Sequence, residues 1–427
     1  MKKNLFLILV SFLTLSVSAA ERVTFDQLRS NWSKYINKDV VVTTPLVVCG
    51  SYFDSLVLAP ERLYCAEEKA IGLADGDSTL YWAIKQQNKE RSIVVNCRNK
   101  YYNVRTGDRV RTLKARVSKE RHLVTGSGVK TCHSKEDKLP KPEKGILRVV
   151  GANIENYFAD LGGYAHKRTT PDQQALQTKK LVKGLKAMNA DIFAFCEMQI
   201  GDKAPKMLLE ELNKGKVQYD FVSMPLANMD RIGGCFVYRV DKVKPYGQPK
   251  SAYKDTASHY HGRMFAVGFE QIETGEKIII SINHFKSKRI GRDGTNGNDK
   301  RMNNADSLIA MLPKAIVEFN DADVLLLGDY NCYTQEQPIQ TIVRNGYGDQ
   351  LWRFCNDDYS YVYKGEMGFL DRCFASPSMA EQITNVRTWH VNADWYYQHG
   401  AHKMKDKSYH RYSDHDPIIV DIKTSSR

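Results

Sequence analysis

A charged run that contains two prolines interrupts the chain after its first third and separates stretches of different character. Between residues 134 and 145, Pro140 and Pro142 stand among lysines and acidic residues, with almost no apolar side chain. Prolines within a charged run are typical of a linker. A chain of 427 residues also exceeds what one hydrophobic core usually organises. We therefore predict two domains, at residues 21–134 and 146–427, joined by a linker at residues 135–145.

The first twenty residues differ from both predicted domains. Lys2 and Lys3 precede an apolar run from Leu5 to Val17, and the small residues Ser18–Ala20 follow it. This layout is typical of a secretory signal peptide, and the apolar run is short for a membrane span. We predict that residues 1–20 are a signal peptide and that the mature protein is exported, to a periplasm or out of the cell. No membrane span and no obligate protein partner are expected.

The charge balance favours a polyanionic partner. The formal net charge is +13, and it falls to +11 without residues 1–20, which hold two lysines and no acidic residue. Such a surplus attracts polyanions, because binding releases their counterions and the field steers their approach. A basic surface that serves only solubility would explain the same charge. Composition leaves both interpretations open.

The nine cysteines include no C-x-x-C pair, which argues against a structural zinc site. Export would permit disulfides, and the four cysteines of the first third would allow two bridges in three different pairings. These four are Cys49, Cys65, Cys97 and Cys132. Later in the chain, the apolar surroundings of Cys196 and Cys332 predict buried, inert thiols.

Residues 21–134 are predicted to be mostly β. Apolar residues at helical spacing indicate an opening helix within Thr24–Tyr35. In Leu113–Val117, apolar residues alternate with basic ones, which gives a strand one apolar and one basic face. Short strands fit a small oligonucleotide-binding (OB) type barrel, which either contacts a substrate or only packs on the second domain. The strand-like segments are Asp39–Val48, Leu80–Ala83, Ser92–Cys97 and Asp108–Leu123.

Residues 146–427 alternate apolar strands with amphipathic helices, which predicts a layered α/β domain. Helices are expected at Pro171–Met188 and Asn304–Phe319. The expected strands are Gly145–Ala152, Asp191–Cys196, Cys235–Arg239, Met264–Phe269, Lys277–Asn283, Val324–Leu327 and Ile418–Ile422.

Polar residues recur where these apolar strands end. They include Asn153, Glu197, His284, Asp329, Asn331, Asp371, Asp414 and His415. Strand ends hold side chains rigidly while the adjoining loops stay accessible, so sites tend to assemble there. The sequence therefore predicts that these residues converge.

The residue types suit the hydrolysis of a phosphodiester. That reaction needs a cation against developing charge, a group that orients or deprotonates water, and donors for phosphate oxygens. Glu197, Asp414 and Asn153 offer the hard oxygen ligands that Mg²⁺ prefers. His415 beside Asp371 would be an oriented imidazole. The chain has no phosphate-binding P-loop and no serine nucleophile elbow, which disfavours nucleotide-triphosphate motors and α/β-hydrolases.

The order of these motifs resembles the endonuclease/exonuclease/phosphatase superfamily, to which deoxyribonuclease I and exonuclease III belong. The similarity spans about residues 146–425, and Trp389–Asp394 is similar to secreted bacterial nucleases of that superfamily. The motifs are Asn153–Asn156, Ala194–Glu197, Asn283–Lys288, Gly328–Asn331, Leu370–Arg372 and Ser413–Pro417.

The resemblance implies a four-layer sandwich, with two β-sheets flanked by helices, and one shallow metal site. It implies Mg²⁺, with Mn²⁺ or Ca²⁺ as alternatives, held by Glu197 with Asn153 and Asp414 nearby. It also implies catalytic roles for a second group of residues, which comprises His284, Asp329, Asn331, Asp371 and His415. Arg372, which follows Asp371, departs from the residue type that many members have there.

Basic residues near these motifs are candidates for substrate contact. We predict that Arg263, Lys286 and Arg301 bind substrate phosphates, although ordinary solvated or ion-paired side chains would account for them too.

Three functions compete. The first is a secreted metal-dependent nuclease acting on DNA, RNA or both. The second is a phosphatase or phosphodiesterase acting on lipids or small phosphoesters, similar to a sphingomyelinase. The third is a non-catalytic binding protein with the same fold. The basic charge and the predicted OB-type domain favour the nuclease, and the presence of both Glu197 and His415 argues against an inactive relative.

Overall fold

The computed structural model describes residues 20–424 except 53–54, 98–103, 127–128, 134, 136, 162–169, 225–231, 257, 259, 292–293 and 396–407. The predicted signal peptide thus lies outside the described residues, apart from Ala20. Within the described part, no helix combines the length and the hydropathy that a bilayer crossing requires.

The N-terminal part of the described chain is built on one eight-stranded sheet, in the order β1-β2-β7-β8-β5-β4-β3-β6. Its strands are β1 Glu21–Val23, β2 Asp39–Val42, β3 Leu46–Tyr52, β4 Ser55–Ala59, β5 Ile93–Asn96, β6 Arg109–Val110, β7 Leu113–Val117 and β8 His122–Val124. Its helices are α1 Phe25–Ser30, α2 Trp32–Tyr35, α3 Ala66–Lys69, the short 3₁₀ helix η1 Leu73–Asp75 and α4 Thr79–Arg91. We call this unit, residues 20–133, the N-terminal part.

Local sequence signals account for much of this unit. The expected opening helix is confirmed as α1 and α2, and Thr24 caps α1 in a reciprocal hydrogen-bonded pair with Gln27. Strand β7 has the alternation predicted for Leu113–Val117, with its apolar residues buried and Lys114 and Arg116 exposed. An OB-type barrel stays a prediction.

One strand expectation for this part was wrong. Leu80–Ala83 lies within α4 and is not a strand. The strand-forming Leu, Tyr and Trp at its start are followed by a run of Lys, Gln, Glu and Arg, which are good helix formers, and the helix continues through them to Arg91. None of the nine cysteines forms a disulfide, and Cys49, Cys65 and Cys97 are separately buried.

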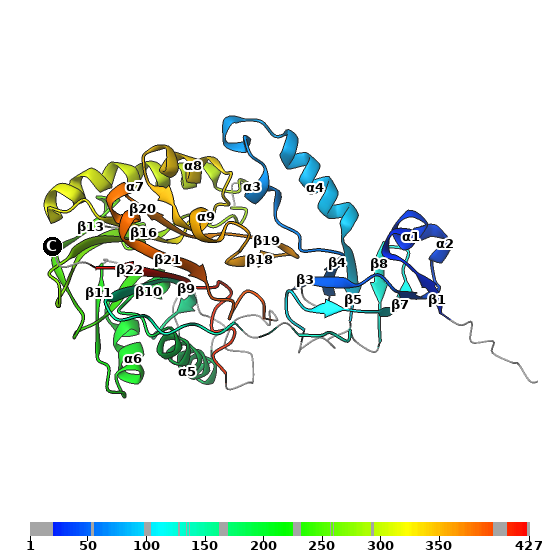
Figure 1. Ribbon diagram of the computed structural model, residues 1–427, viewed down its shortest axis with the longest axis horizontal. Helices are drawn as coiled ribbons and strands as arrows, with labels where there is room; N and C mark the ends of the chain where they lie inside the picture. Colours follow the sequence, from blue (N-terminus) through cyan, green and yellow to red (C-terminus); the bar gives the residue numbers. More distant parts are fainter. Residues whose placement is uncertain are drawn as a thin grey trace, which may run out of the picture.

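The remaining described chain forms a sandwich of two six-stranded sheets, with helices over both outer faces (Figure 1). One sheet has the order β11-β12-β10-β9-β22-β21 and the other β13-β14-β15-β16-β20-β17. The strands of these two sheets are β9 Ile146–Tyr157, β10 Ile192–Gln199, β11 Tyr219–Ser223, β12 Ile232–Arg239, β13 Val243–Ser251, β14 Met264–Gln271, β15 Lys277–His284, β16 Val324–Asp329, β17 Gly348–Asp349, β20 Asp371–Ala375, β21 Ile383–Thr388 and β22 Ile418–Lys423. Strands β18 Tyr361–Tyr363 and β19 Glu366–Gly368 form a separate two-stranded sheet.

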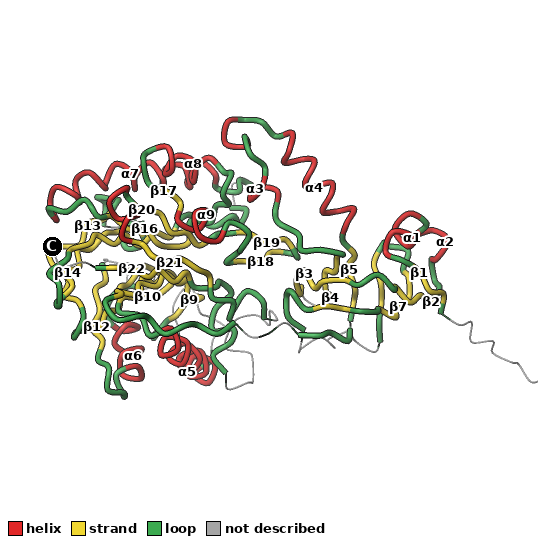
Figure 2. Tube along the Cα trace, in the orientation of Figure 1, coloured by secondary structure: helices red, strands yellow, loops and turns green. Residues whose placement is uncertain are grey.

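The helices of the sandwich are α5 Pro171–Met188, α6 Lys203–Leu212, α7 Asn298–Phe319, α8 Gln337–Arg344, α9 Gln350–Cys355 and α10 Pro377–Gln382. Helices α5 and α6 cover the sheet of β9 and β10, and α7 and α8 cover the other sheet (Figure 2). Alternation along β16 builds two of the layers, because Leu325 and Leu327 pack between the sheets while Val324 and Leu326 pack under α7. The predicted helices and strands of this part, and its layered α/β class, are confirmed.

A buried ion pair joins the N-terminal part to the sandwich. Arg372 of β20 is 1% exposed, and its Nη2 lies 3.3 Å from Oε2 of Glu68 in α3, which is 2% exposed. Arg372 also donates to Asp349 at 2.9 Å and to Thr334, whose hydroxyl in turn donates to Glu68. These contacts account for the arginine that follows Asp371.

We expect Glu68→Ala to lower the free energy of unfolding by about 3–5 kcal/mol, because it leaves the charge of Arg372 buried without this partner. Denaturant unfolding monitored by tryptophan fluorescence would measure the change. Lys69→Ala is the control. It removes an ion pair to Asp357, whose side chain is 87% exposed, so its cost should stay below about 1 kcal/mol. Equal effects of the two substitutions would contradict this account of the interface.

Candidate metal and catalytic site

Three neighbouring strands of one sheet present polar side chains at the same edge. Strands β15 and β16 are parallel with His284 opposite Asp329, and β16 and β20 are antiparallel with Asp329 opposite Asp371. The Cα atoms of directly opposite residues on paired strands lie about 4.5–5.5 Å apart. The strand register alone therefore brings these three residues together. Gly328 permits it, since a Cβ atom there would lie 1.9 Å from the carbonyl oxygen of Asn283.

The facing sheet supplies Asn153 from β9 and Glu197 from β10. Asn153 Nδ2 donates to Asp329 Oδ2 at 3.1 Å, a hydrogen bond between the two sheets. Glu197 Oε2 accepts from the backbone N–H of Asn156 at 3.0 Å. Glu197 has φ of +63°, and Asn331 has φ of +49°. Side chains other than glycine rarely adopt this conformation, and such strained backbone is typical of functional sites.

Two carboxylates and one imidazole lie close enough together to share a metal ion. Ligand atoms of Glu197, His284 and Asp329 all lie within 4.8 Å of one another. His284 Nε2 is 3.7 Å from Glu197 Oε1 and 3.8 Å from Asp329 Oδ2. Burial raises the pKa of Glu197, and the charge of Asp414 raises it further, which places Asp414 beside the same group. Two or three carboxylates in a partly dry site fit a hard divalent cation.

His415 and Asp371 form an oriented pair next to this cluster. His415 Nδ1 lies 2.8 Å from Asp371 Oδ2, and its Nε2 lies 4.0 Å from Asp329 Oδ2. Burial alone would lower the pKa of His415, but the carboxylates of Asp371, Asp329 and Asp414 raise it well above its usual value. These carboxylates favour the protonated imidazole, and the contact of Nδ1 with Asp371 directs Nε2 toward Asp329.

Asp329 occupies the centre of the arrangement. Its Oδ1 accepts from the backbone N–H of Asn331 at 2.8 Å, and its Oδ2 accepts from the Asn331 side chain at 3.1 Å. Burial, opposed by His415 and reinforced by Asp371, raises the pKa of Asp329 to about 7. A carboxyl group with such a pKa exchanges protons near neutral pH.

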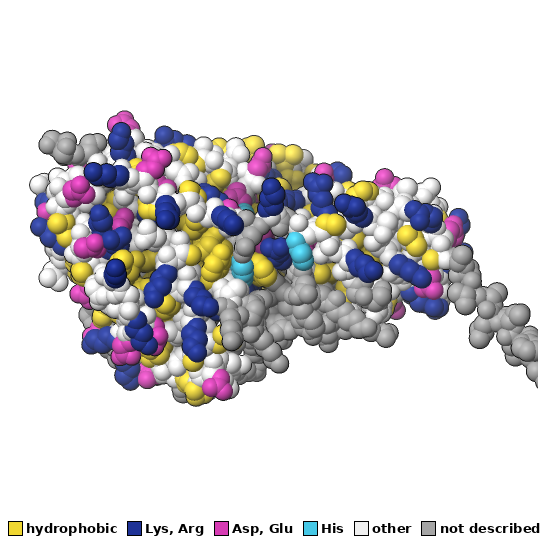
Figure 3. All heavy atoms as spheres, turned by 60° about the horizontal axis from the view of Figure 1, so that its bottom comes forward, with side chains coloured by type: hydrophobic (Ala, Val, Ile, Leu, Met, Phe, Trp, Pro, Cys, Tyr) yellow, Lys and Arg dark blue, Asp and Glu magenta, His cyan; other side chains and the backbone are white. Residues whose placement is uncertain are grey.

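The predicted substrate-binding residues differ in their positions. Arg263 lies near the site, because its charge lowers the pKa of Glu197, and its Nε donates to the carbonyl oxygen of Ile232 at 3.2 Å. The ammonium of Lys286 donates to the carbonyl oxygen of Ser287 at 2.9 Å. On the face turned forward in Figure 3, histidine side chains reach the surface where the N-terminal part meets the sandwich, with Lys and Arg side chains beside them.

Arg301 corrects one expectation. Its side chain is 0% exposed, so it does not meet a substrate in this conformation. Its Nη1 donates to the carbonyl oxygen of Asn296 at 2.7 Å and also reaches those of Lys286 and Ser287 at 3.4 and 3.5 Å. Arg301 thus supports the loop after β15. Its position near the basic loop suggested substrate contact, but its place on the buried face of α7 decides otherwise.

Sequence reasoning missed several residues that shape the site. The ring centroid of Tyr361 lies 4.6 Å from that of His415. The Ser360 hydroxyl accepts from the backbone N–H of Asp371 at 3.0 Å, and Asn392 Nδ2 donates to the carbonyl oxygen of His415 at 2.7 Å. The motif Trp389–Asp394 contains Asn392, so the sequence held a signal for this residue. The β18–β19 hairpin gave no signal, because Tyr361 does not follow a buried strand.

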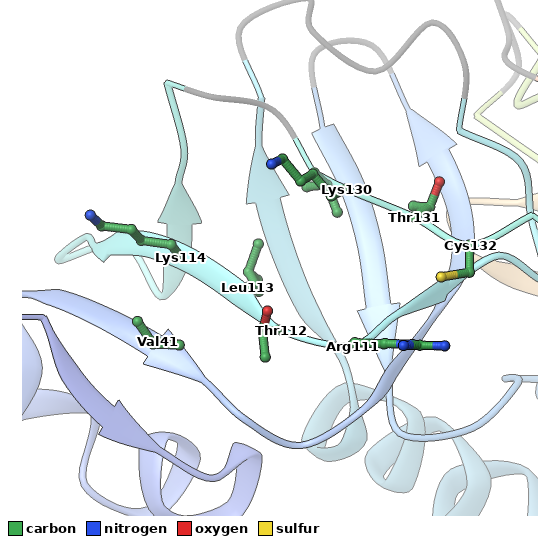
Figure 4. Close-up of a pocket in the computed structure, with 9 residues that line it drawn as sticks. Val41, Arg111, Thr112, Leu113, Lys114, Lys130, Thr131 and Cys132 are labelled. Carbon is green, nitrogen blue, oxygen red and sulfur yellow. The ribbon is translucent and has the colours of Figure 1, made fainter.

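A separate groove of about 440 Å³ lies on the N-terminal part. Among the described residues, its lining includes Arg111, Lys114 and Lys130 and no acidic side chain. In Figure 4 the side chains of Lys114 and Lys130 extend toward the same side of the groove, while that of Arg111 points away from them. The groove therefore gathers positive charge on a sheet surface.

No protein-family model matches the sequence, and a comparison with curated proteins finds no match. Similar solved structures include an endonuclease/exonuclease/phosphatase from Bacteroides vulgatus, with 15% identity over 66% of this chain and 99% of that chain, at a TM-score of 0.46. An endonuclease/exonuclease/phosphatase family protein from Bacteroides thetaiotaomicron has 18% identity over 66% and 98%, at 0.45. The human Nocturnin catalytic domain with bound sulfate has 16% identity over 66% and 95%, at 0.44. The structures similar to this chain thus include ones that carry the name of the superfamily its motifs resemble.

Proposed function

We propose that the protein is a divalent-metal-dependent phosphodiesterase that hydrolyses nucleic acid by attack of water on phosphorus. The observation that carries the proposal is the convergence of Glu197, His284 and Asp329 within 4.8 Å, next to the His415–Asp371 pair. Carboxylates for a cation, an oriented imidazolium and a carboxyl group with a raised pKa are the groups that this reaction requires.

Each group has a task that follows from its surroundings. Glu197 and Asp329, with Asn153 and Asp414 nearby, would hold Mg²⁺ or Mn²⁺, which neutralises charge on the phosphate when it is bound. Asp329 orients the attacking water and accepts its proton, because the backbone N–H of Asn331 fixes its Oδ1 while its Oδ2 lies 4.0 Å from Nε2 of His415. His415 donates from Nε2 to the phosphate, while Asp371 fixes its ring at Nδ1. His284 and Arg263 add positive charge or donors beside the same phosphate.

Charge supports nucleic acid as the substrate class. The mature chain would carry a formal charge of +11, and the groove with Arg111, Lys114 and Lys130 provides a basic surface outside the catalytic cluster. We also propose export, which rests on residues 1–20 and their signal-like layout.

The proposal is tested by incubating the purified protein with plasmid DNA, structured RNA and single-stranded oligonucleotides, in Mg²⁺ and in EDTA. Cleavage in Mg²⁺ that EDTA abolishes supports it. No cleavage of any nucleic acid overturns it. Release of phosphate or headgroup from lipids or sugar phosphates would then identify the phosphoesterase of small substrates, and no hydrolysis of any kind would identify a binding protein.

Glu197→Gln should reduce kcat by at least about 100-fold and weaken Mn²⁺ binding, because it removes one negative charge from the metal cluster without changing its volume. Discontinuous activity assays would give kcat, and isothermal titration calorimetry with Mn²⁺ alone would give the affinity for the metal ion. Lys206→Ala, on the exposed surface of α6, is the control and should change neither value. Unchanged Mn²⁺ affinity in Glu197→Gln would remove this residue from the metal site.

Asp371→Asn should lower kcat by roughly 100-fold or more while KM changes less than threefold, because the amide neither holds His415 by charge nor raises its pKa. The pKa of His415, followed by NMR of the imidazole protons, should fall in this variant. A normal kcat together with an unchanged imidazole pKa would show that the pair has no part in the reaction.

A further inference from the structure

A pocket of about 460 Å³ opens beside the catalytic cluster, and both parts of the molecule line it. Glu67 of α3 and Lys85 of α4 come from the N-terminal part. Lys288, Asn331 and Tyr361 come from the sandwich. We call it the shared pocket. Its volume lies in the range of sites that bind small organic ligands, about 300–1,000 Å³.

Two of its lining residues also contact the catalytic groups. The Tyr361 ring centroid lies 4.6 Å from that of His415, and Asn331 Nδ2 donates to Asp329 Oδ2 at 3.1 Å. The shared pocket and the catalytic cluster therefore adjoin at Asn331 and Tyr361, so a ligand in the pocket would lie next to a phosphate held by the cluster.

The lining combines aromatic faces with charged groups at their edges. Tyr333, Tyr361 and Tyr363 contribute rings, and Tyr363 is 54% exposed, with Lys364 Nζ 5.2 Å from its ring centroid. Lys288 Nζ lies 5.0 Å above the Tyr333 ring, and Lys85 Nζ lies 3.1 Å from Glu366. A nucleobase offers a flat π-face for stacking and an edge of hydrogen-bond donors and acceptors. The tyrosine rings of the pocket could stack on the face of a base, and its charged groups could hydrogen-bond to the edge of the base.

The N-terminal part is held in place at this pocket. The backbone N–H of Cys65 donates to the carbonyl oxygen of Met367 at 2.9 Å, and Asn88 Nδ2 donates to Glu366 Oε1 at 3.0 Å. Glu68, which forms the buried ion pair with Arg372 of β20, lies next to Glu67 in helix α3. These contacts fix Glu67 and Lys85 relative to the catalytic strands, so the N-terminal part supplies a fixed wall of the pocket.

We propose that the shared pocket binds the base and sugar of the nucleotide next to the scissile phosphate, so that the N-terminal part completes the substrate site. This inference rests on the proposed nuclease function. It assigns substrate recognition to residues of α3 and α4, which lie outside the sandwich that carries the catalytic groups.

The test compares Tyr363→Ala and Lys85→Met with the wild type on a hexanucleotide and on a hexamer of the same backbone that lacks all bases. Tyr363→Ala should raise KM for the hexanucleotide roughly 5- to 100-fold, the range expected for one lost stacking contact, with kcat within twofold. Lys85→Met should raise KM in the same direction. Neither variant should change kcat/KM for the base-free hexamer. Lys206→Ala, the control, should leave all values unchanged.

An unchanged KM in Tyr363→Ala, or an equal loss on both hexamers, would overturn the inference. Fluorescence anisotropy of the labelled hexanucleotide in EDTA separates it from the proposed function, because binding there needs no turnover. If the wild type cleaves no nucleic acid yet binds the hexanucleotide, and Tyr363→Ala weakens this binding about fivefold or more, the pocket stands and the nuclease does not. If the wild type neither cleaves nor binds, both fail.

Discussion

The hydrogen bond from Asn153 to Asp329 joins the ends of the two sheets, and the proposed site depends on it. Each sheet alone presents an incomplete set, with Asn153 and Glu197 on one and His284, Asp329 and Asp371 on the other. The apolar layer between the sheets fixes their separation, since Leu325 and Leu327 of β16 pack there against Val149 and Ile192. The core therefore sets the distance between the groups that are to share one cation.

The electrostatics of the site explain why a cation belongs there. Glu197 and Asp329 are largely removed from water, and burial is the main cause that raises the pKa of each. Asp371 and Asp414 add like charge, which the positive charges of His415 and Arg263 and the hydrogen bonds from Asn153 and Asn331 oppose in part. Clustered carboxylates with this little compensation either take up protons or bind a metal ion. A bound divalent ion would return these groups to their ionised forms.

The sequence predicted the site better than it predicted the surroundings of the site. Asn153, Glu197, His284 and Asp329 were identified because each directly follows an apolar run, and such a run is a local property of the chain. Tyr361, Ser360 and the burial of Arg301 depend on how distant segments pack, which periodicity does not report. The secondary structure of Leu80–Ala83 also depends on distant contacts. Its strand-forming residues Leu, Tyr and Trp belong to helix α4, in which Asn88 donates a hydrogen bond to Glu366 of the sandwich. Cys49, Cys65 and Cys97 lie in three different hydrophobic clusters, a separation that cysteine spacing in the sequence does not report.

Strand β20 contacts both the N-terminal part and the candidate site. Successive side chains on a strand point to opposite faces, so Asp371 faces His415 while Arg372 turns toward Glu68 of α3. One strand thus orients the imidazole and anchors the helix that borders the shared pocket. A displacement of α3 would alter the surroundings of Arg372 and, through the backbone of β20, the position of Asp371. The packing of the N-terminal part and the geometry of the His415–Asp371 pair are therefore linked through one strand.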